Sequence, residues 1–518
     1  MKRIVSICLL VLVLGACEKE HFITDPVYRA TVEEDFQKKK AVFGESGAAL
    51  FGVFDSVMTL PEREALTFLY AYSPLVDISF SGGDYLLDNV RLAFRAREEM
   101  PWGLSVPENI FRHFVLPARG GKENLDTARA VFFRELKERV AACENMEQAA
   151  LEVNHWCHEN VIYKPTNART SSPLATRQRA YGRCGEESVF TLAALRAVGI
   201  PARQIYTPRW AHCDDNHAWI EVWIDGEWKY LGACEPEPRL NIAWFTLPVQ
   251  RAMYVEAEVF GKYDGDEEIV FTNDNASAVN VTSRYTRTKR TVVQVKDSLG
   301  RPVEGARVEY KIFNYGEYYP VATLVADARG ETALTLGEGD IMVWASDGER
   351  FGFGRFSVEE QDTLVIALDK RAGDAFSAEF DLVPPVQRDI EALSTADERA
   401  ANDRRLVHED SLRNAYVATF MTAEAARGMA VELGMDTARF ARYIRLARGN
   451  CAEIERLFRE VGDKERAMQL LDVVAEKDLQ DTPADVWLDH VAGTRDFPDG
   501  ELFREYVLNP RVQNELIT

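Results

Sequence analysis

The feature that most constrains this chain is a cysteine placed where a buried helix begins. Residues 186–198 are apolar on nearly every side, which predicts a helix enclosed in the core. Gly199 and Pro201 follow, and this pair is typical of the end of a helix. Cys184 is therefore expected at the positive end of a central helix, where free backbone N–H groups stabilise a thiolate or an oxyanion. The sequence predicts a thiol nucleophile at this position.

A histidine on a strand supplies the base that such a nucleophile needs. Alternation from His217 to Ile224 predicts a strand, and Asp225-Gly226 predicts the turn of a hairpin. His217 shares a strand face with Trp219 and Trp223, which are expected to line a substrate groove. A lone cysteine or histidine is most often structural, but the order of thiol, buried helix, strand and histidine favours a nucleophile–base pair.

Three motifs resemble those of the transglutaminase-like branch of the papain-like cysteine enzymes. They are Arg183-Cys184-Gly185-Glu186, the run from Arg196 to Arg203, and the run from Asn216 to Trp223. The resemblance covers residues 151–237 and implies a papain-like core with acyl-enzyme chemistry at an amide. It also implies Cys184 as the nucleophile and His217 as the base. The residues around Cys184 are similar to those of peptide N-glycanases, which belong to the same superfamily.

Gly232 occupies the position where the resembled family has an aspartate that orients the histidine. With a two-residue hairpin loop His217 lies opposite Cys234, and a one-residue bulge places Glu235 there instead. Glu235 is the expected orienter because an ionised carboxylate stabilises an imidazolium. Three other residues stay open as orienters: Asp214, Asp215 and Asn241. A site with only cysteine and histidine, slow or inactive, also fits the sequence.

The N-terminus predicts export and a lipid anchor. Lys2 and Arg3 precede an apolar run at 4–14, which is too short to span a membrane and is typical of a signal peptide. The tetrad Leu14-Gly15-Ala16-Cys17 resembles a bacterial lipobox, which implies removal of residues 1–16 and lipidation of Cys17. We therefore expect a protein tethered to the bacterial cell envelope, periplasmic or surface-exposed, at the outer membrane. The lipid is its only expected membrane contact.

Composition excludes nucleic acid as a partner. The 518-residue chain has a formal net charge of −22, and it becomes two units more negative when Lys2 and Arg3 leave with the signal peptide. Such a body is repelled by nucleic acid and by anionic membrane surfaces. The expected partner is instead a peptide, protein or glycopeptide substrate.

No metal or other cofactor is expected. His155, Cys157 and His158 lie close together, but no Cys-x-x-Cys pair occurs and zinc sites usually need four convergent ligands. The eight cysteines do not form a disulfide framework. Cys213 and Cys234 flank the predicted site, and a disulfide between them stays open.

The changing patterns along the chain predict a multidomain α+β protein. The expected order is a signal peptide at 1–16, a helical lead-in at 17–140, a transglutaminase-like catalytic domain at 141–288, a β-sandwich at 289–372 and a helical C-terminal region at 373–518. Five short strands separated by turns predict a small antiparallel sandwich. Its residues 295–308 resemble the carboxypeptidase-regulatory-like, transthyretin-type modules, for which a spacer role is expected.

Three classes of function follow. The first is a cysteine hydrolase that cleaves a peptide, isopeptide or glycan-linked amide through an acyl-Cys184 intermediate. The second is a cross-linking acyl transferase that uses the same pair and accepts an amine. The third is a non-catalytic binding module on a degenerate site, suggested by Gly232. Hydrolysis ranks first because water is abundant outside the cell and no pattern identifies an amine site.

Overall fold

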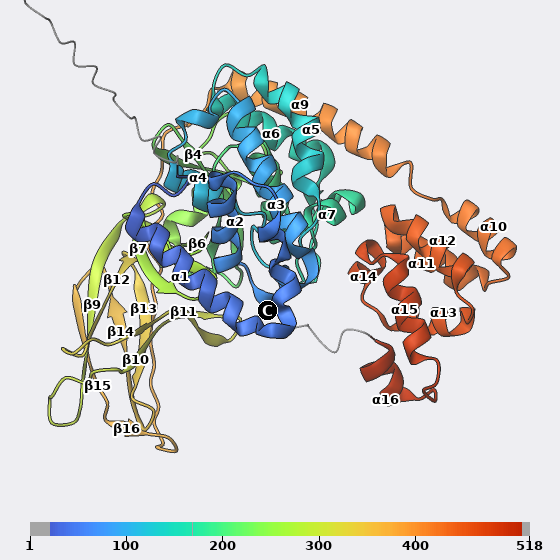
Figure 1. The fold of residues 1–518 in the computed structure, drawn as a ribbon. Helices are drawn as coiled ribbons and strands as arrows, with labels where there is room; N and C mark the ends of the chain where they lie inside the picture. Colours follow the sequence, from blue (N-terminus) through green and yellow to red (C-terminus); the bar gives the residue numbers. More distant parts are fainter. Residues whose placement is uncertain (1–20, 168, 510–518) are drawn as a thin grey trace, which may run out of the picture.

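The computed structural model describes residues 21–167 and 169–509 (Figure 1). The expected signal peptide and the expected lipidation site at Cys17 lie outside the described residues. Within the described ranges, no helix combines the length and the apolarity that crossing a membrane requires. The chain forms a helical N-terminal section, a mixed core, a β-sandwich and a helical C-terminal section.

The N-terminal section is a layer of helices that share one aromatic-rich core. The longest helix of this section is kinked at Gly82, whose φ of 75° lies outside the helical region. The helices are α1 (Pro26–Phe43), α2 (Leu60–Tyr72), α3 (Leu75–Glu99) and α4 (Glu108–Phe114).

The mixed core surrounds one buried helix, α8 (Cys184–Ala197). Helices α5, α6 and α8 and strands β3 to β5 contribute to a single hydrophobic cluster. α5 therefore packs in the same core as the predicted catalytic domain, on the other side of the boundary expected at residue 140. The remaining helices are α5 (Ala128–Ala141), α6 (Met146–Asn160) and α7 (Pro173–Arg179).

The sheet beside α8 has six strands in the order β5-β4-β3-β6-β8-β7. They are β3 (Ala202–Thr207), β4 (His217–Ile224), β5 (Glu227–Leu231), β6 (Glu256–Phe260), β7 (Glu268–Thr272) and β8 (Ala276–Asn280). A separate parallel pair joins β1 (Ile162–Tyr163) to β2 (Tyr181–Gly182). The predicted helix, strand and hairpin are confirmed, and Gly199 ends the helix at φ 72°.

The β-sandwich has a five-stranded sheet, β11-β10-β13-β14-β16, and a three-stranded sheet, β12-β9-β15. It is not wholly antiparallel, because β15 pairs with β9 in parallel. Three of its eight strands, β11, β14 and β16, have no counterpart among the five expected strands. The strands are β9 (Thr288–Lys296), β10 (Arg307–Asn314), β11 (Glu317–Val325), β12 (Glu331–Gly337), β13 (Asp340–Ser346), β14 (Arg350–Ser357), β15 (Thr363–Ala367) and β16 (Lys370–Arg371).

The C-terminal section starts with a linker and continues as helices. Residues 374–392 have no helix or strand, so this part of the expected helical region is extended. The helices are α9 (Ala396–Val417), α10 (Ala423–Leu433), α11 (Thr437–Ala447), α12 (Cys451–Glu460), α13 (Lys464–Val473), α14 (Glu476–Asp481), α15 (Ala484–Thr494) and α16 (Glu501–Phe503).

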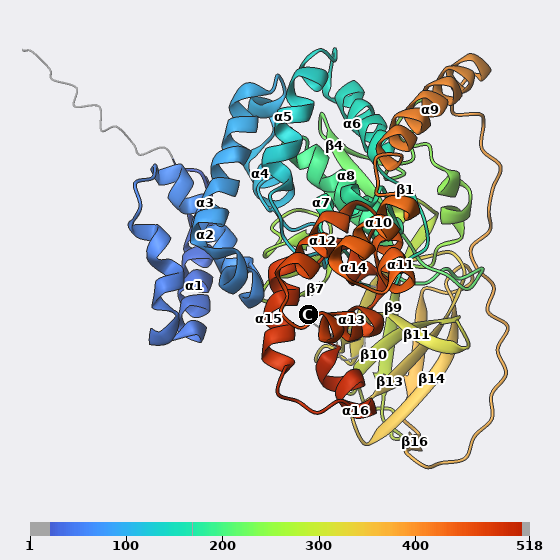
Figure 2. The ribbon, with the colours of Figure 1, turned by 90° about the vertical axis from the view of Figure 1, so that its right-hand side faces the viewer.

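The last two sections both contact the mixed core. α9 packs on α6, and α14 packs on α7 (Figure 2). From the other side, the hairpin of β10 and β11 reaches the loop that precedes β4, since Asn314 Nδ2 donates to the Trp210 carbonyl oxygen at 2.9 Å. The neighbours of β4 and α8 are therefore drawn from distant parts of the chain.

Candidate active site

Cys184 is the first residue of α8, as the sequence predicts. Its side chain is half-buried, and burial raises the pKa of the thiol above its usual value. The backbone N–H groups of Ala218 and Gly185 lower that pKa, as does the Arg183 guanidinium, while Glu187 raises it. Donors from the helix N-terminus and from β4 thus converge on the sulfur, which is the arrangement that stabilises a thiolate.

His217 is the first residue of β4, the strand that packs on α8. The two are linked through Ala218, which follows His217 and whose N–H group acts on the Cys184 sulfur. The imidazole is only 8% exposed, and burial lowers the pKa of His217 to about 4. At neutral pH the unliganded site therefore holds a neutral imidazole beside a protonated thiol. A neutral imidazole is the form that accepts a proton.

No carboxylate orients His217 within the described residues, and its Nε2 atom is buried without a hydrogen-bond partner. The hairpin ladder is regular from Ile224–Glu227 to Ile220–Leu231, where β5 ends. His217 pairs with Thr207 on β3 instead. The hairpin argument that placed Cys234 or Glu235 opposite His217 is therefore wrong, because β5 stops before it reaches that level.

Glu235 nevertheless lies against Gly232, the position where the resembled family has its aspartate. The two residues form a bridge in a tight turn, and a Cβ atom added to Gly232 would lie 3.0 Å from Glu235 Oε2. That oxygen accepts a hydrogen bond of 3.0 Å from the Trp244 indole, whose ring centroid is 4.8 Å from the imidazole of His217. Burial raises the pKa of Glu235 to about 7. A displaced carboxyl thus occupies the space of the missing aspartate.

The three other residues that stayed open as orienters have local partners. Asp214 accepts a hydrogen bond from the Tyr315 amide at 2.7 Å, and Asp215 accepts one from the Asn216 amide at 2.8 Å. Asn241 Oδ1 accepts one from the Tyr230 amide at 2.9 Å. In the described part of the chain none of the three is hydrogen-bonded to His217, whereas Glu235 lies against Gly232.

The expected substrate-facing tryptophans are in the wrong place for that role. Trp219 is fully buried, and its indole donates to the Tyr285 hydroxyl at 2.9 Å. Trp223 lies six residues along the strand from His217, roughly 20 Å away. The prediction assumed one solvated strand face, whereas β4 lies inside the sheet and both its faces are covered. Trp244, 56% exposed, is the aromatic residue that stands beside His217 at the surface.

Glu186, the last residue of the first motif, anchors the start of α8. Its Oε2 accepts from the Arg183 amide at 3.1 Å and from the Thr166 hydroxyl at 3.0 Å. Its Oε1 lies 2.6 Å from the guanidinium of Arg179. Although burial alone would raise it, the nearby cations lower the pKa of Glu186 to about 2. This buried carboxylate fixes the segment that carries Cys184.

Lys477 comes from α14 of the C-terminal section and completes that anchor. Its ammonium lies 2.9 Å from Glu186 Oε1, and both side chains are almost fully buried. It also donates to the Thr166 hydroxyl and to the Asn167 carbonyl oxygen, at 3.0 and 3.1 Å. Burial lowers the pKa of Lys477 to about 8. No local pattern could have identified this lysine, because its partner is distant in sequence.

The two cysteines considered for a disulfide are not bonded to each other, and the two histidines considered for a metal site have partners within the protein. Cys213 and Cys234 are both free thiols, one exposed and one buried. His155 lies 2.9 Å from Glu409 on α9, and His158 Nδ1 lies 2.9 Å from the Cys234 carbonyl oxygen. Among residues 21–167 and 169–509, no cluster of three or more metal-type ligands is found. The two histidines thus help to join α6 to its neighbours.

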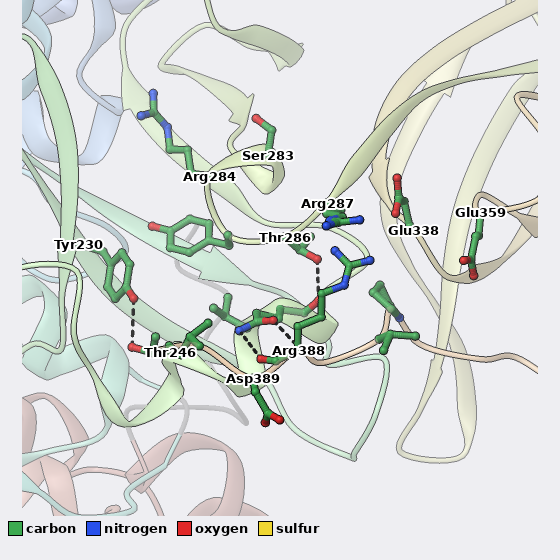
Figure 3. A pocket seen from close by; sticks show the side chains of 16 residues that line it. Tyr230, Thr246, Ser283, Arg284, Thr286, Arg287, Glu338, Glu359, Arg388 and Asp389 are labelled. Atoms are coloured by element: carbon green, nitrogen blue, oxygen red, sulfur yellow. Dashed lines mark hydrogen bonds between the residues drawn. The ribbon is translucent and has the colours of Figure 1, made fainter. Parts of the chain in front are cut away.

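A separate cavity of about 500 Å³ lies between the mixed core, the sandwich and the linker (Figure 3). Arg284, Arg287 and Arg388 contribute to its wall, together with Glu338 and Glu359. Neither Cys184 nor His217 lines it, so it is distinct from the candidate active site. The short turn Trp244–Thr246 runs between the two, with Trp244 at His217 and Thr246 at the cavity.

Residues 134–233 match the model of the transglutaminase-like superfamily. This segment is therefore similar to transglutaminase-like domains. Proteins of that superfamily are generally cysteine proteases or acyltransferases, so the match supports cysteine-based hydrolysis or acyl transfer. The domain contains Cys184, His217 and Gly232, and it ends just before Glu235.

The individual relatives overlap this chain only in part. An uncharacterised protein of Mycobacterium leprae (strain TN) is 29% identical over 105 residues, which are 18% of this chain and 37% of the relative. The match thus spans well under half of that curated relative. A candidate cysteine protease of Cytophaga hutchinsonii has 19% identity and a TM-score of 0.22, over 35% of this chain and 66% of its own. Red sea bream transglutaminase has 10% identity and a TM-score of 0.19, over 58% of each chain. Neither TM-score is high enough to support a conclusion.

Proposed function

We propose that this protein is a cysteine hydrolase that cleaves a peptide, isopeptide or glycan-linked amide through an acyl-Cys184 intermediate. The observation that carries the proposal is the position of Cys184 at the N-terminus of α8, where the backbone N–H groups of Ala218 and Gly185 lower the pKa of its thiol. Such donors favour the thiolate, and they also favour the oxyanion that forms when a carbonyl is attacked.

Two half-reactions follow from this arrangement. His217 accepts the thiol proton as the Cys184 sulfur bonds to the substrate carbonyl carbon. The C–N bond then breaks, and His217 returns the proton to the leaving amine. In the second half, His217 takes a proton from water, which attacks the thioester. The acid leaves and the thiol regains its proton.

Glu235 is the proposed third member of the site. When His217 becomes an imidazolium, a nearby carboxylate stabilises it, and the carboxyl of Glu235 fills the space that Gly232 leaves. Trp244 lies between the two, with its indole on Glu235 and its ring against His217. We propose that ionised Glu235 acts on the imidazolium across this aromatic contact.

We also propose that a lipid on Cys17 holds the protein at the bacterial cell envelope. The support is in the sequence, where the apolar run at 4–14 leads to Leu14-Gly15-Ala16-Cys17. In a bacterial host, the full chain should sediment with membranes, and Cys17→Ser should move it to the soluble fraction. Equal sedimentation of both forms would contradict the lipid anchor.

The reaction is tested by following what happens to the acyl group. Peptide and glycopeptide amides are offered to the full chain with and without an excess of a primary amine, and the products are identified by mass spectrometry. We expect free acid as the main product, and no product from Cys184→Ala. A new amide as the main product would make the protein an acyl transferase. Tight binding without product, unchanged in Cys184→Ala, would make it a binding module.

A further inference from the structure

Arg209 lies at the same end of the sheet as His217. It follows β3 directly, and the last residue of that strand, Thr207, pairs with His217 in the ladder. The Thr207 hydroxyl also donates to the Arg209 carbonyl oxygen at 3.4 Å, which keeps the chain close as it leaves the strand. The sheet register thus brings Arg209 to the edge where the imidazole stands.

A residue of the sandwich holds the guanidinium of Arg209 flat. The Cζ atom of Arg209 lies 3.9 Å from the ring centroid of Tyr319, on β11, and 5.7 Å from that of Tyr315. Stacking of this kind fixes the plane of a guanidinium and leaves its edges free to donate. The sandwich therefore contributes to the surroundings of the active site.

Arg209 has no acidic partner within the described residues, although acids outnumber bases in the chain. Its Nη1 donates to the Pro208 carbonyl oxygen at 2.8 Å, and its Nε is buried without a partner. A buried charged donor without an acceptor costs free energy. An arginine so placed has unused capacity for an anion.

A second cation, Arg183, also acts on the Cys184 thiol and lowers its pKa. Arg183 immediately precedes Cys184, and it donates to the Thr170 hydroxyl at 2.9 Å and to the Asn167 carbonyl oxygen at 3.2 Å. Tyr206 pairs with Ala218 in the ladder, next to His217. Burial raises the pKa of Tyr206 to about 12; Arg209 and Arg183 lower it, and Cys184 raises it. The phenol therefore lies close to both cations and to the thiol.

We propose that Arg209, assisted by Arg183, binds a carboxylate of the substrate next to the amide that Cys184 attacks. The substrate class is then a peptide amide with a free carboxylate close to the bond that is cleaved. The planar fork of an arginine matches a carboxylate with two parallel hydrogen bonds. Asp214 and Asp215 lie in the loop between Arg209 and His217, are exposed, and each accept a hydrogen bond from a backbone amide. The inference rests on the proposed function, since it assumes that Cys184 is the attacking group.

Two alkylating reagents that differ only in charge test this site. Iodoacetate and iodoacetamide both form an S–C bond at Cys184 and release iodide, but only iodoacetate carries a carboxylate. For the full chain we expect Arg209→Gln to lower the iodoacetate-to-iodoacetamide rate ratio at Cys184 about tenfold, the worth of a hydrogen bond to a charged group. Arg209→Lys should lose part of that preference. Arg388→Gln, which removes an equal charge at the separate cavity, is the control and should leave the ratio unchanged.

Two results would overturn the proposal: an unchanged ratio in Arg209→Gln, which includes equal slowing of both reagents, or an equal fall in Arg388→Gln. A second measurement does not need a reactive thiol. In Cys184→Ala, the Nε–H nuclear magnetic resonance of Arg209 should shift on addition of N-acetylglycine and not of its methylamide. Equal shifts, or none, would exclude a carboxylate site. If Cys184 fails to react while N-acetylglycine still binds, the proposed function fails and the carboxylate site stands.

Discussion

Glu235 carries a prediction about pH. Its pKa in the folded protein is about 7, against an ordinary value of 4.5, and the cause is burial. The folded state therefore holds this proton between those pH values, where the unfolded state has lost it. The stability that the neutral carboxyl contributes is complete below about pH 4.5 and is lost as the pH rises through 7.

The substitution Glu235→Gln removes this pH dependence, because an amide cannot ionise. At pH 8 the variant should have the higher free energy of unfolding, by at most about 3 kcal/mol, and at pH 4 the two proteins should match. Denaturant melts at the two pH values measure this, with the exposed Glu227→Gln as control.

Glu235→Gln should also lose roughly 10² to 10⁴-fold in turnover, since the imidazolium loses its carboxylate. Full activity in Glu235→Gln together with inactivity in Asp215→Asn would show that the third residue is Asp215.

At the scale of elements, the hairpin of β10 and β11 supports the loop that leads into β4. The Asn314 amide donates to the carbonyl oxygens of Trp210, Cys213 and Asp215, at 2.9, 2.7 and 3.4 Å. Asn314→Ala would leave these acceptors without their donor, so turnover should fall by about tenfold while Cys184 stays in place. Thr323→Ala, on the same β11, is the control. Unchanged turnover in Asn314→Ala would return the sandwich to the spacer role that the sequence suggests.

How far the sequence could predict each element depends on how local its causes are. α8 and the β4–β5 hairpin were predictable, because apolar periodicity, Gly199 and Asp225-Gly226 act within a few residues. The place of Trp219 was not, because burial of both faces of β4 depends on strands and helices that pair later. The end of β5 at Leu231 likewise follows from Asn154 on α6, whose amide donates to the Gly232 carbonyl oxygen at 2.9 Å.

At the scale of the whole molecule, the C-terminal section is tied to the catalytic helix through Lys477. The substitution Lys477→Met leaves Glu186 with Arg179 as its remaining buried cation. Breaking a buried pair from one side costs about 3 to 5 kcal/mol, so the contact between α14 and the core should loosen. Faster trypsin cleavage in the linker at Arg388 and slower alkylation of Cys184 should follow.

The control for that experiment is Lys464→Met, which removes a lysine from α13 in the same section. Lys464 donates to the Leu433 carbonyl oxygen inside the section and does not reach the core. The substitution Lys464→Met should leave unchanged both the rate of trypsin cleavage at Arg388 and the rate of alkylation at Cys184. Equal effects of the two substitutions would show that only the stability of the helical section changes, and that Lys477 has no influence on Cys184.

The central claim, that His217 activates Cys184, is tested most directly by comparing cysteines within one molecule. Cys213 is exposed, whereas Cys184 is half-buried and so less accessible. Burial raises the pKa of both thiols. Accessibility alone would therefore make Cys213 the faster to react with iodoacetamide at pH 7. With peptide mapping as the readout, we predict that Cys184 is alkylated faster than Cys213, and that His217→Ala slows Cys184 and leaves Cys213 unchanged. Alkylation of Cys213 ahead of Cys184, with no effect of His217→Ala, would contradict the account.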